Sequence, residues 1–493
     1  MTITVATQYR LSKKSIVKDY TTKSHTLGLN QDANAREDDT SANRPYLVFC
    51  STAASGHFYP ILQIATHMVQ RGFEATIITD KKHEQQVISS GAGHVALPFF
   101  MPSPESLEER KELTNGFQSM VWGLTHVVMK RTPLYYKTVV ETLEALRQER
   151  PSQQIIIIQD LVFIAANALA LGARLPTGFT VRPTIIHVNV VPLPVPSIDI
   201  GPFGFGLPPD SSESGRSRNK LLHQLCCSPQ GPFAAFCNEY NRVMECLGVT
   251  VDPTIDAFIS ITSCPDVTLQ ACSPSLEYPR SDLPDHVKFI GCLPRKSLDP
   301  SYRYPAWWSS ITNPLHLQRK KIIGVAQGTI AVDYNHLIIP TIQGLADRDD
   351  IIVVALLGVK GASLSEGFQV PSNARVLDFM PYEALLPHLD VWVINAGYGG
   401  FTQGIMHGVP MVLCGDTEDK ADVSMRGEWA GVGFNLRTGS PTPQQVARGV
   451  EEVLTNHKYK RQVVAIRKEN VEMNSLETIE SYIWRFTDKK KGK

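Results

Sequence analysis

The sequence predicts an α/β protein with two doubly wound parallel-sheet domains. Short apolar runs of strand length alternate with amphipathic helical segments in two series, residues 45–292 and 319–470. Residues 293–318, rich in proline and without periodicity, separate the two series and predict an interdomain linker. The chain has 493 residues, of which 43% are hydrophobic and 19% charged, and this is enough to build two cores.

The first series opens with a buried strand at Tyr46–Cys50 and a loop of small residues, 51–56. A helix follows, because apolar side chains recur at helical spacing from Ile61 to Met68, and Ala75–Thr79 is the next strand. Such a strand–loop–helix–strand unit is typical of a parallel sheet, in which ligands bind at the carboxyl ends of the strands. The later elements expected in this series are a helix at 135–149, a strand at 155–158, a helix at 165–171 and a strand at 184–190.

The second series repeats this order. We expect a strand at 322–326, a loop at 327–329, a helix at 338–346 and strands at 351–357, 391–394 and 411–414. Two such units facing each other across a cleft are the architecture that the two series imply.

Bulk composition limits the classes of partner. The 48 basic and 48 acidic residues balance, so charge gives no reason to expect nucleic acid or an anionic membrane surface. No apolar run reaches the roughly 18 residues of a spanning helix, so stable membrane insertion is not expected. The nine cysteines form no CxxC pair and are interpreted as reduced thiols of a cytoplasmic protein. We expect a disordered polar tail at 1–44 and a helix with a basic tail at 471–493; protein partners are left open.

A glycine-rich turn, Asn395-Ala-Gly-Tyr-Gly-Gly-Phe-Thr-Gln403, follows the strand at 391–394 and precedes an apolar helix. Glycines allow backbone N–H groups to approach a diphosphate, and the amino end of the helix adds a favourable partial charge. A tight turn without a ligand is the alternative, and glycine content alone does not decide between them.

The sequence around this turn, residues 373–433, resembles the donor-binding signature of the UDP-glycosyltransferase superfamily, which includes plant natural-product and bacterial macrolide glycosyltransferases. In the first series the resemblance continues through Gly56-His57 with Pro60, Arg71-Gly72 and Asp160. It covers roughly residues 45–470 and implies the GT-B fold, with an acceptor-binding Rossmann-like domain at 45–292 and a donor-binding one at 319–470. The matching stretches of the second series are Val376–Pro381, Leu385-Leu386, Asp390, the glycine-rich turn, Gly408–Pro410 and Thr417–Lys420.

The resemblance implies that His57 is the general base and that Asp160 orients it. An independent argument supports His57: the loop places it at the amino end of a helix, where the dipole disfavours imidazolium, so we expect a neutral imidazole near pH 7. The alternatives are a structural histidine and an aspartate that caps a turn.

On the donor side, the resemblance implies that Phe379 stacks on uracil, where plant members carry tryptophan, and that Gly328-Thr329 and the glycine-rich turn (Gly397, Gly399 and Gly400) hold the diphosphate. Asn395 replaces a histidine of many members, and its amide still offers a hydrogen bond to phosphate. Gly400 replaces the usual serine, which removes one donor.

Asp419-Lys420 stands where plant members have an acidic residue followed by glutamine, the pair that holds the sugar. Lys420 offers an ammonium in place of a carbonyl acceptor, so the donor sugar is open, and a solvated loop is the alternative reading for Lys420. UDP-sugar is then a co-substrate, and we expect no cofactor and no metal. Asp347-Arg-Asp349 formally matches the aspartate pair of metal-dependent glycosyltransferases, but it precedes the strand at 351–357 and is interpreted as a solvated turn.

Acceptor contacts are expected from the first domain, where Phe100, Met120 and Trp122 belong to an apolar cluster between residues 99 and 122. These side chains could equally be core. The segment 192–209, rich in proline and glycine, predicts a long loop near the cleft.

These features predict a UDP-sugar-dependent hexosyltransferase of secondary metabolism. It would transfer glucose, with inversion, to a hydroxyl of a small lipophilic acceptor (a phenol, polyketide, sterol or lipid) and form a β-glycoside. A nucleotide-sugar epimerase on the same fold and a non-catalytic nucleotide-sugar binding protein are the alternatives.

Overall fold

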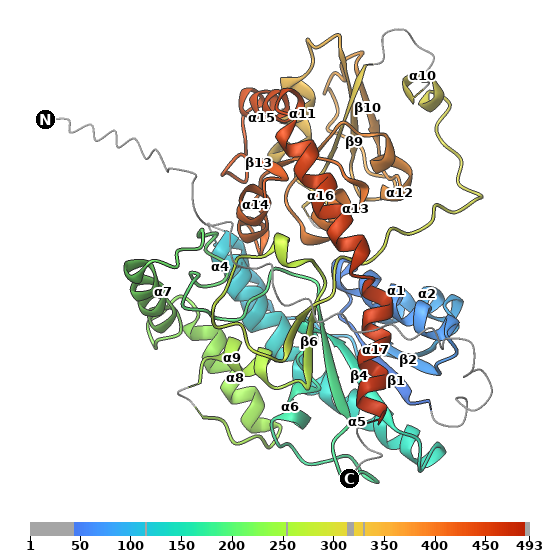
Figure 1. Ribbon diagram of the computed structural model, residues 1–493, viewed down its shortest axis with the longest axis vertical. Coiled ribbons are helices and arrows are strands. Elements are labelled where there is room, and N and C mark those ends of the chain that lie inside the picture. Colours follow the sequence, from blue (N-terminus) through green and yellow to red (C-terminus); the bar gives the residue numbers. More distant parts are fainter. Residues whose placement is uncertain (1–43, 114–115, 253–254, 313–319, 329–330, 489–493) are drawn as a thin grey trace, which may run out of the picture. The chain divides into compact units, whose positions relative to one another are not determined.

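Two parallel sheets organise the chain (Figure 1). The computed structural model describes residues 44–113, 116–252, 255–312, 320–328 and 331–488, and both sheets lie within one unit, residues 45–493. In the described residues the first sheet has seven strands: β1 (Tyr46–Cys50), β2 (Ala75–Thr79), β3 (Gly93–Ala96), β4 (Ile155–Asp160), β5 (Thr184–Asn189), β6 (Val267–Gln270) and β7 (Val287–Phe289).

The first sheet is doubly wound, with the strand order β3-β2-β1-β4-β5-β6-β7 and parallel pairing in every described pair. The order reverses between β1 and β4, where Cys50 pairs with Gln159. The loops that follow β1 and β4 run in opposite directions from this point, so ligands of such sheets bind between them.

Helices cover both faces of this sheet, which explains why β1 is apolar at every position. Leu47 and Phe49 face the helices α1 (Ser55–Gln70) and α17 (Ser475–Asp488), while Val48 faces α5 (Lys130–Glu149) on the other side.

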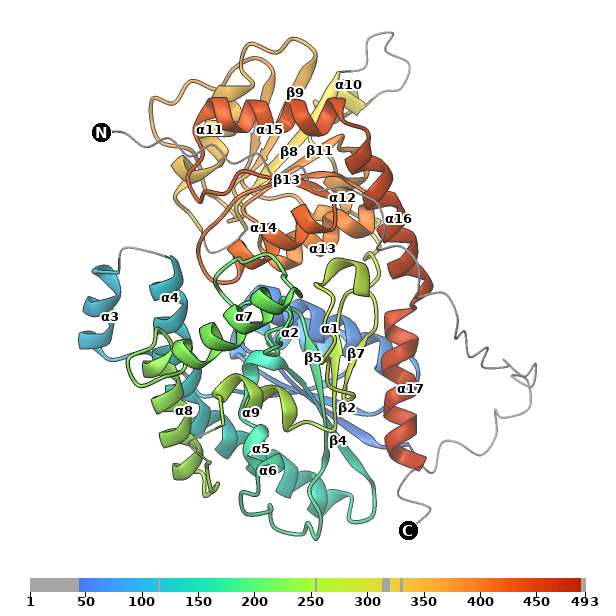
Figure 2. The ribbon, with the colours of Figure 1, turned by 60° about the vertical axis from the view of Figure 1, so that its left-hand side comes forward.

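The second sheet repeats the topology, with the order β10-β9-β8-β11-β12-β13. Its helices α13 (Tyr398–His407) and α16 (Lys458–Glu472) cover one face, and α11 (Ile338–Gly344) and α15 (Pro443–Thr455) cover the other (Figure 2). In the described residues its strands are β8 (Lys321–Ala326), β9 (Ile351–Leu356), β10 (Ala374–Leu377), β11 (Val391–Ile394), β12 (Met411–Leu413) and β13 (Gly433–Asn435).

The remaining helices of the described residues surround these two layers. In the first half they are α2 (Glu84–Ser89), α3 (Pro104–Lys111), α4 (Gly116–Trp122), a π-helical stretch (Gly123–Met129), α6 (Asn167–Ala170), α7 (Glu213–Cys226), α8 (Ala234–Cys246) and α9 (Ala257–Ser263). In the second half they are α10 (Trp308–Thr312), α12 (Tyr382–Leu385) and α14 (Lys420–Trp429). Short 3-10 turns lie at Lys81–His83, Leu161–Phe163, Pro274–Leu276, Tyr334–His336 and Leu386–His388.

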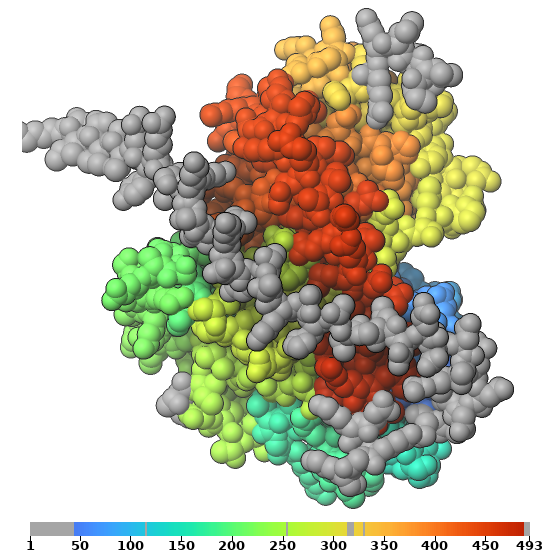
Figure 3. All heavy atoms as spheres, in the orientation of Figure 1, coloured from blue at the N-terminus to red at the C-terminus, as the bar shows by residue number. Residues whose placement is uncertain are grey.

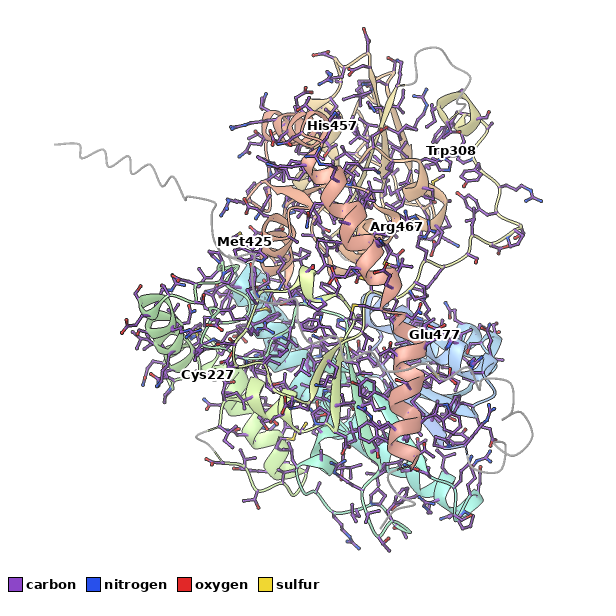
Figure 4. All side chains as sticks on the ribbon, viewed as in Figure 1. Cys227, Trp308, Met425, His457, Arg467 and Glu477 are labelled. Carbon is purple, nitrogen blue, oxygen red and sulfur yellow. The ribbon has the colours of Figure 1, made fainter. Side chains whose placement is uncertain are left out.

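The C-terminal helices connect the two halves. Helix α16 packs on α13 of the second half, and α17 packs on α1 of the first, where Ile479 and Ile483 enter the core. Figure 3 shows the atoms of these helices in red on the surface of both halves, and Figure 4 labels Arg467 on α16 and Glu477 on α17. Near the end of α16, Asn470 Oδ1 accepts hydrogen bonds from the backbone N–H groups of Ser273 and Cys292 in the first half, at 2.9 and 2.8 Å.

Two parallel-sheet α/β domains confirm the predicted fold class, and the predicted strands at 46–50, 75–79 and 391–394 have the observed bounds. The predicted helices are found with shifted ends. The first, α1, begins at Ser55, before the apolar spacing of Ile61–Met68, so Pro60 lies inside it. Of the predicted tails, residues 1–43 and 489–493 lie outside the described residues. No helix within the described ranges is both long and apolar enough to cross a bilayer.

Candidate active site

His57 and Asp160 meet at the switch point of the first sheet. His57 lies in the first turn of α1, directly after the β1 loop, and Asp160 is the last residue of β4. The Asp160 Oδ1 atom lies 2.8 Å from His57 Nδ1; the Asp160 side chain is 1% exposed and that of His57 21%. With Nδ1–H donating to the carboxylate, the lone pair of Nε2 is free to accept a proton. Asp160 also accepts the backbone N–H of Val162, so it orients the histidine and caps a turn.

Opposing effects set the pKa of His57. Burial lowers this pKa, but the charge and hydrogen bond of Asp160, with the charge of Asp419, outweigh burial and the nearby Arg131, so the pKa lies above its usual value. The prediction from the helix dipole, a lowered pKa that keeps the His57 imidazole neutral, is therefore wrong in direction. Two carboxylates close to the ring favour the imidazolium more than the amino end of the helix disfavours it.

Arg131 is the residue of this group that the sequence did not reveal. It lies in the first turn of α5, with its guanidinium 5.2 Å from the centre of the Tyr135 ring. Burial lowers the pKa of Arg131, while Tyr135 and Asp160 raise it, and its charge acts on His57. Helical periodicity predicts α5 but not which of its polar residues turns toward another loop, and no motif contains Arg131.

The switch point of the second sheet holds the predicted diphosphate loops. Gln327-Gly328 follows β8 and Asn395 follows β11, its neighbour in the sheet. The Asn395 Nδ2 amide donates to the Gln327 carbonyl at 2.6 Å and so ties the two loops together. Ala396, next in the turn, is fully buried with a φ of 55°, a strained conformation that is concentrated at functional sites. Thr329 lies outside the described residues.

The amino end of α13 is open beside these loops. Gly397 is the N-cap and, as a glycine, has no side chain that could cap the helix. Around Gly399 no described atom outside the helix's own backbone lies within 4 Å of the position of a Cβ, and at Gly400 the nearest atoms are those of the Tyr382 ring at 3.9 Å. The described residues therefore leave room for a ligand beside Gly399 and Gly400, in the first turn of a ten-residue helix, where anions can bind to the N–H groups.

Phe379 presents a half-exposed ring, 45% accessible, after β10. Its backbone is fixed by Asp378, whose carboxylate accepts the N–H groups of Phe379 and Gly361 at 2.7 Å each. The Lys360 ammonium lies 5.5 Å from the ring centre. Such a fixed, accessible aromatic face is suited to stacking on a planar base.

Asp419 and Lys420 lie where the loop after β12 enters α14. The Lys420 ammonium hydrogen-bonds to Thr417 Oγ1 and pairs with Glu418, so it is held within its own loop and not surrounded by solvent. Burial raises the pKa of Asp419 to about 6, although Lys420 and His57 lower it. The charges of Asp419 and His57 influence each other's pKa, so the predicted sugar-binding loop and the predicted base are electrostatically linked.

The three predicted acceptor residues differ in their surroundings. Phe100 is half-buried. Met120 is 7% exposed and lies against the loop at Gly204. Trp122 is 5% exposed; its indole N–H donates to the Ser106 carbonyl at 3.1 Å and its ring stacks on His126, which places it within the packing of the first half.

Phe205 is an apolar side chain that the prediction did not single out. It is 39% exposed, lies on the 192–209 segment, and its ring centre is 4.7 Å from that of Phe117 on α4. The Gly-Pro-Phe-Gly-Phe-Gly pattern at 201–206 was a signal for it, because Phe205 stands between two glycines that offer no side chain to cover its ring.

Comparisons with known proteins agree with this geometry. Residues 340–479 match the family model "Erythromycin biosynthesis protein CIII-like, C-terminal domain". UDP-glucosyltransferase 1 of Beauveria bassiana (strain ARSEF 2860) is 37% identical over 443 residues, 89% of this chain and 95% of the relative. UDP-glucosyltransferase A1 of Starmerella bombicola is 32% identical, covering 90% of this chain and 92% of the relative. The 4′-demethylrebeccamycin synthase of Lentzea aerocolonigenes is 31% identical, with 86% and 95% covered.

Solved structures share the fold at lower identity. The glycotransferase of kitacinnamycin superposes with a TM-score of 0.64 at 20% identity, covering 90% of this chain and 99% of the other. The calicheamicin glycosyltransferase CalG4 gives 0.61 at 16% identity with the same coverage. The architecture is therefore GT-B, and the relatives that match along nearly their whole length show that the chain belongs to the UDP-glycosyltransferase superfamily, enzymes that transfer a sugar from a nucleotide-sugar donor to an acceptor.

Proposed function

We propose that this enzyme transfers glucose from UDP-glucose to a hydroxyl of a small lipophilic acceptor, with inversion at the anomeric carbon and with His57 as general base. The observation that carries the proposal is the 2.8 Å contact between His57 Nδ1 and Asp160 at the switch point of the first sheet. It leaves Nε2 as the proton acceptor. The names of the fungal and yeast relatives, UDP-glucosyltransferases, support glucose as the sugar.

The reaction follows as a single displacement. His57 Nε2 removes the proton of the acceptor hydroxyl while the acceptor oxygen bonds to the anomeric carbon of the donor. The bond between that carbon and the diphosphate oxygen breaks, and UDP leaves with the electron pair. Asp160 stabilises the imidazolium formed, as the carboxylate of a catalytic dyad does. Attack opposite the leaving group converts an α-linked donor into a β-glycoside.

The second half would hold the donor. We assign uracil stacking to Phe379 and the diphosphate to Gly328, Thr329 and the first turn of α13, with Gly397, Gly399 and Gly400 providing close backbone approach. The Asn395 amide has one hydrogen engaged by Gln327 and a second available for phosphate. The amino end of α13 stabilises the charge that develops on UDP, so the proposed mechanism uses no metal ion. Asp419 and Lys420 would bind the sugar hydroxyls.

The acceptor site is assigned to the first half. Phe100, Met120 and Phe205 would contact the acceptor, with Trp122 supporting this wall from within the fold. Apolar and aromatic side chains with few polar groups favour a lipophilic ligand such as a phenol, polyketide, sterol or hydroxylated lipid.

Incubation of the purified enzyme with UDP-glucose and a panel of phenols and hydroxylated lipids tests the proposal. Wild type should form a glucoside and release UDP, and His57→Ala should lose transfer by at least about 100-fold, the usual contribution of general base catalysis. His67→Ala on the same helix is the matched control and should stay near wild type. Transfer by His57→Ala at the wild-type rate would remove His57 from the mechanism.

A further inference from the structure

The acceptor-side loop 201–207 is docked directly on the start of α14 in the other half. Gly204 N–H donates to Asp422 Oδ2 at 2.5 Å. At Gly206, a Cβ would lie 3.1 Å from the Ala421 side chain. Both contacts fall on the first turn of α14, immediately after Asp419. Figure 4 labels Met425 on the same helix.

A second backbone contact brings α4 against the same segment. At Gly116, the first residue of α4, a Cβ would lie 1.9 Å from the Asp416 carbonyl oxygen, so only glycine permits this approach. Residues 416–422 of the donor half are therefore contacted by two separate segments of the acceptor half.

A buried ion network fixes Asp422. Arg426 lies 3.2 Å from Asp422 Oδ1 and 3.0 Å from Glu277 Oε2, and none of the three side chains is more than 5% exposed. Glu277 belongs to the acceptor half and also accepts the Leu193 N–H at 2.8 Å. Asp422 thus uses one carboxylate oxygen for Arg426 and the other for the loop.

The segment directly before the loop, at Ile198 and Asp199, is fixed within its own half. Asp199 accepts the backbone N–H and the hydroxyl of Ser281 at 2.6 and 2.7 Å and pairs with Arg216 at 2.8 Å. The Asn219 amide donates to the Ile198 carbonyl at 3.0 Å. The 201–207 loop therefore connects α14 of the donor half to a fixed segment of the acceptor half.

We propose that Asp422 is a positioning residue, which holds the 201–207 loop on α14 so that Asp419 and Lys420 are set against the donor sugar and the anomeric carbon is shielded from water. This inference rests on the proposed function. If water replaces the acceptor as nucleophile, the bond to UDP breaks in the same way and the products are glucose, UDP and a proton. Loosening the loop should therefore weaken sugar recognition and favour hydrolysis over transfer, while uridine and diphosphate contacts stay intact.

Two variants disturb the docking by different means. Asp422→Ala removes the acceptor of the Gly204 N–H. Gly206→Ala leaves every buried charge in place and pushes the loop from Ala421. Gly248→Ala is the matched control, because Gly248 also has a positive φ, 81° against 57° at Gly206, but no described atom lies within 4 Å of its Cβ position. Asp422→Asn tests rescue, since its amide oxygen still accepts the N–H.

Calorimetry with UDP and with UDP-glucose measures the affinity that the sugar adds. For Asp422→Ala and Gly206→Ala we expect UDP affinity to stay at the wild-type value and the added affinity of UDP-glucose to fall severalfold. The ratio of glucoside to free glucose should drop by about tenfold, equivalent to 1.4 kcal/mol. Asp422→Asn should recover part of the added affinity and part of the product ratio, and Gly248→Ala should match wild type in both measurements.

The inference is overturned if Asp422→Ala and Gly206→Ala both match Gly248→Ala in the affinity that the sugar adds and in the ratio of glucoside to free glucose. The contact between the loop and α14 would then contribute to packing alone. A wild-type enzyme without transfer to any acceptor would contradict the proposed function, but the binding comparison would still test the role of Asp422.

Discussion

His57 is held between influences of opposite sign, and its pKa is the residue-scale property that the mechanism depends on. Burial and Arg131 lower this pKa, whereas Asp160 and Asp419 raise it. Only the neutral imidazole accepts a proton, so the rate of transfer should rise with pH through the pKa of His57.

Asp160→Asn should lower the pKa of His57, because it removes the carboxylate that favours imidazolium and leaves burial and Arg131 in place. The inflection of kcat/KM against pH should move to lower pH, and kcat should fall by about 100-fold or more because the imidazolium of the transition state loses its partner. A pH–rate profile checks both effects. An unchanged inflection would show that the contact is only a turn cap.

Arg131→Met should move the same inflection in the opposite direction. Removing the cation raises the pKa of His57, so a higher pH is needed to reach full activity. Lys137→Met, on the exposed side of the same helix, is the control and should leave the profile unchanged. A shift of Arg131→Met to lower pH would be incompatible with the charges described here.

At the residue scale, sequence reasoning found His57 and Asp160 because both stand in recognisable motifs at strand ends. It did not find Arg131, which approaches them only through the packing of α5. The direction of the His57 pKa was also missed, because the helix dipole alone leaves out the charge and hydrogen bond of Asp160, which raise this pKa most, and the charge of Asp419, 362 positions later in the chain.

At the scale of elements, the open amino end of α13 is the feature most accessible to engineering. Gly400 is its third helical residue, and a Cβ there meets only the Tyr382 ring at 3.9 Å, an ordinary contact.

Gly400→Ser should therefore fit without displacement. Its hydroxyl adds a donor beside the expected diphosphate, so the KM for UDP-glucose should fall a fewfold, in line with about 1 kcal/mol for one hydrogen bond. Initial rates at varied donor concentration measure this. Gly404→Ser in the same helix is no substitute, since its Cβ would lie 2.8 Å from Met411 Sδ. A raised KM for Gly400→Ser would place the diphosphate elsewhere.

The central strands were predictable because helices cover both faces, which makes runs such as Tyr46–Cys50 and Val391–Ile394 apolar throughout. The edge strand β3 was not predicted: its four residues are partly exposed and include glycine and histidine, so they carry no strand signal. The segment 293–318 showed no helical period, yet α10 forms within it because Trp308 is buried in the second core.

At the scale of the whole molecule, the two halves are joined by buried polar contacts as well as by the C-terminal helices. Glu277 and Arg426 come from different halves, and sequence patterns give no indication of such a pair. Apolar periodicity predicts each core separately, whereas the contacts between cores depend on side chains at the ends of elements.

Arg426→Ala should lower the free energy of unfolding by about 3–5 kcal/mol, because it leaves the Asp422 carboxylate buried without a cation, while Glu277 keeps only Arg280 at 3.6 Å. Urea denaturation measures the loss. Arg437→Ala breaks an exposed pair with Glu428, 2.8 Å long with side chains 61% and 38% accessible, and should cost about 1 kcal/mol or less. Equal losses for the two variants would mean that the Arg426 network is not closed to water.

NMR of the glucosylation reaction, with wild type and His57→Ala followed under the same conditions, tests whether His57 is the base of an inverting transfer. We expect a β-glucoside from α-linked UDP-glucose, formed by wild type and suppressed by at least about 100-fold in His57→Ala. An α-glucoside, or a β-glucoside formed by His57→Ala at the wild-type rate, would contradict this mechanism.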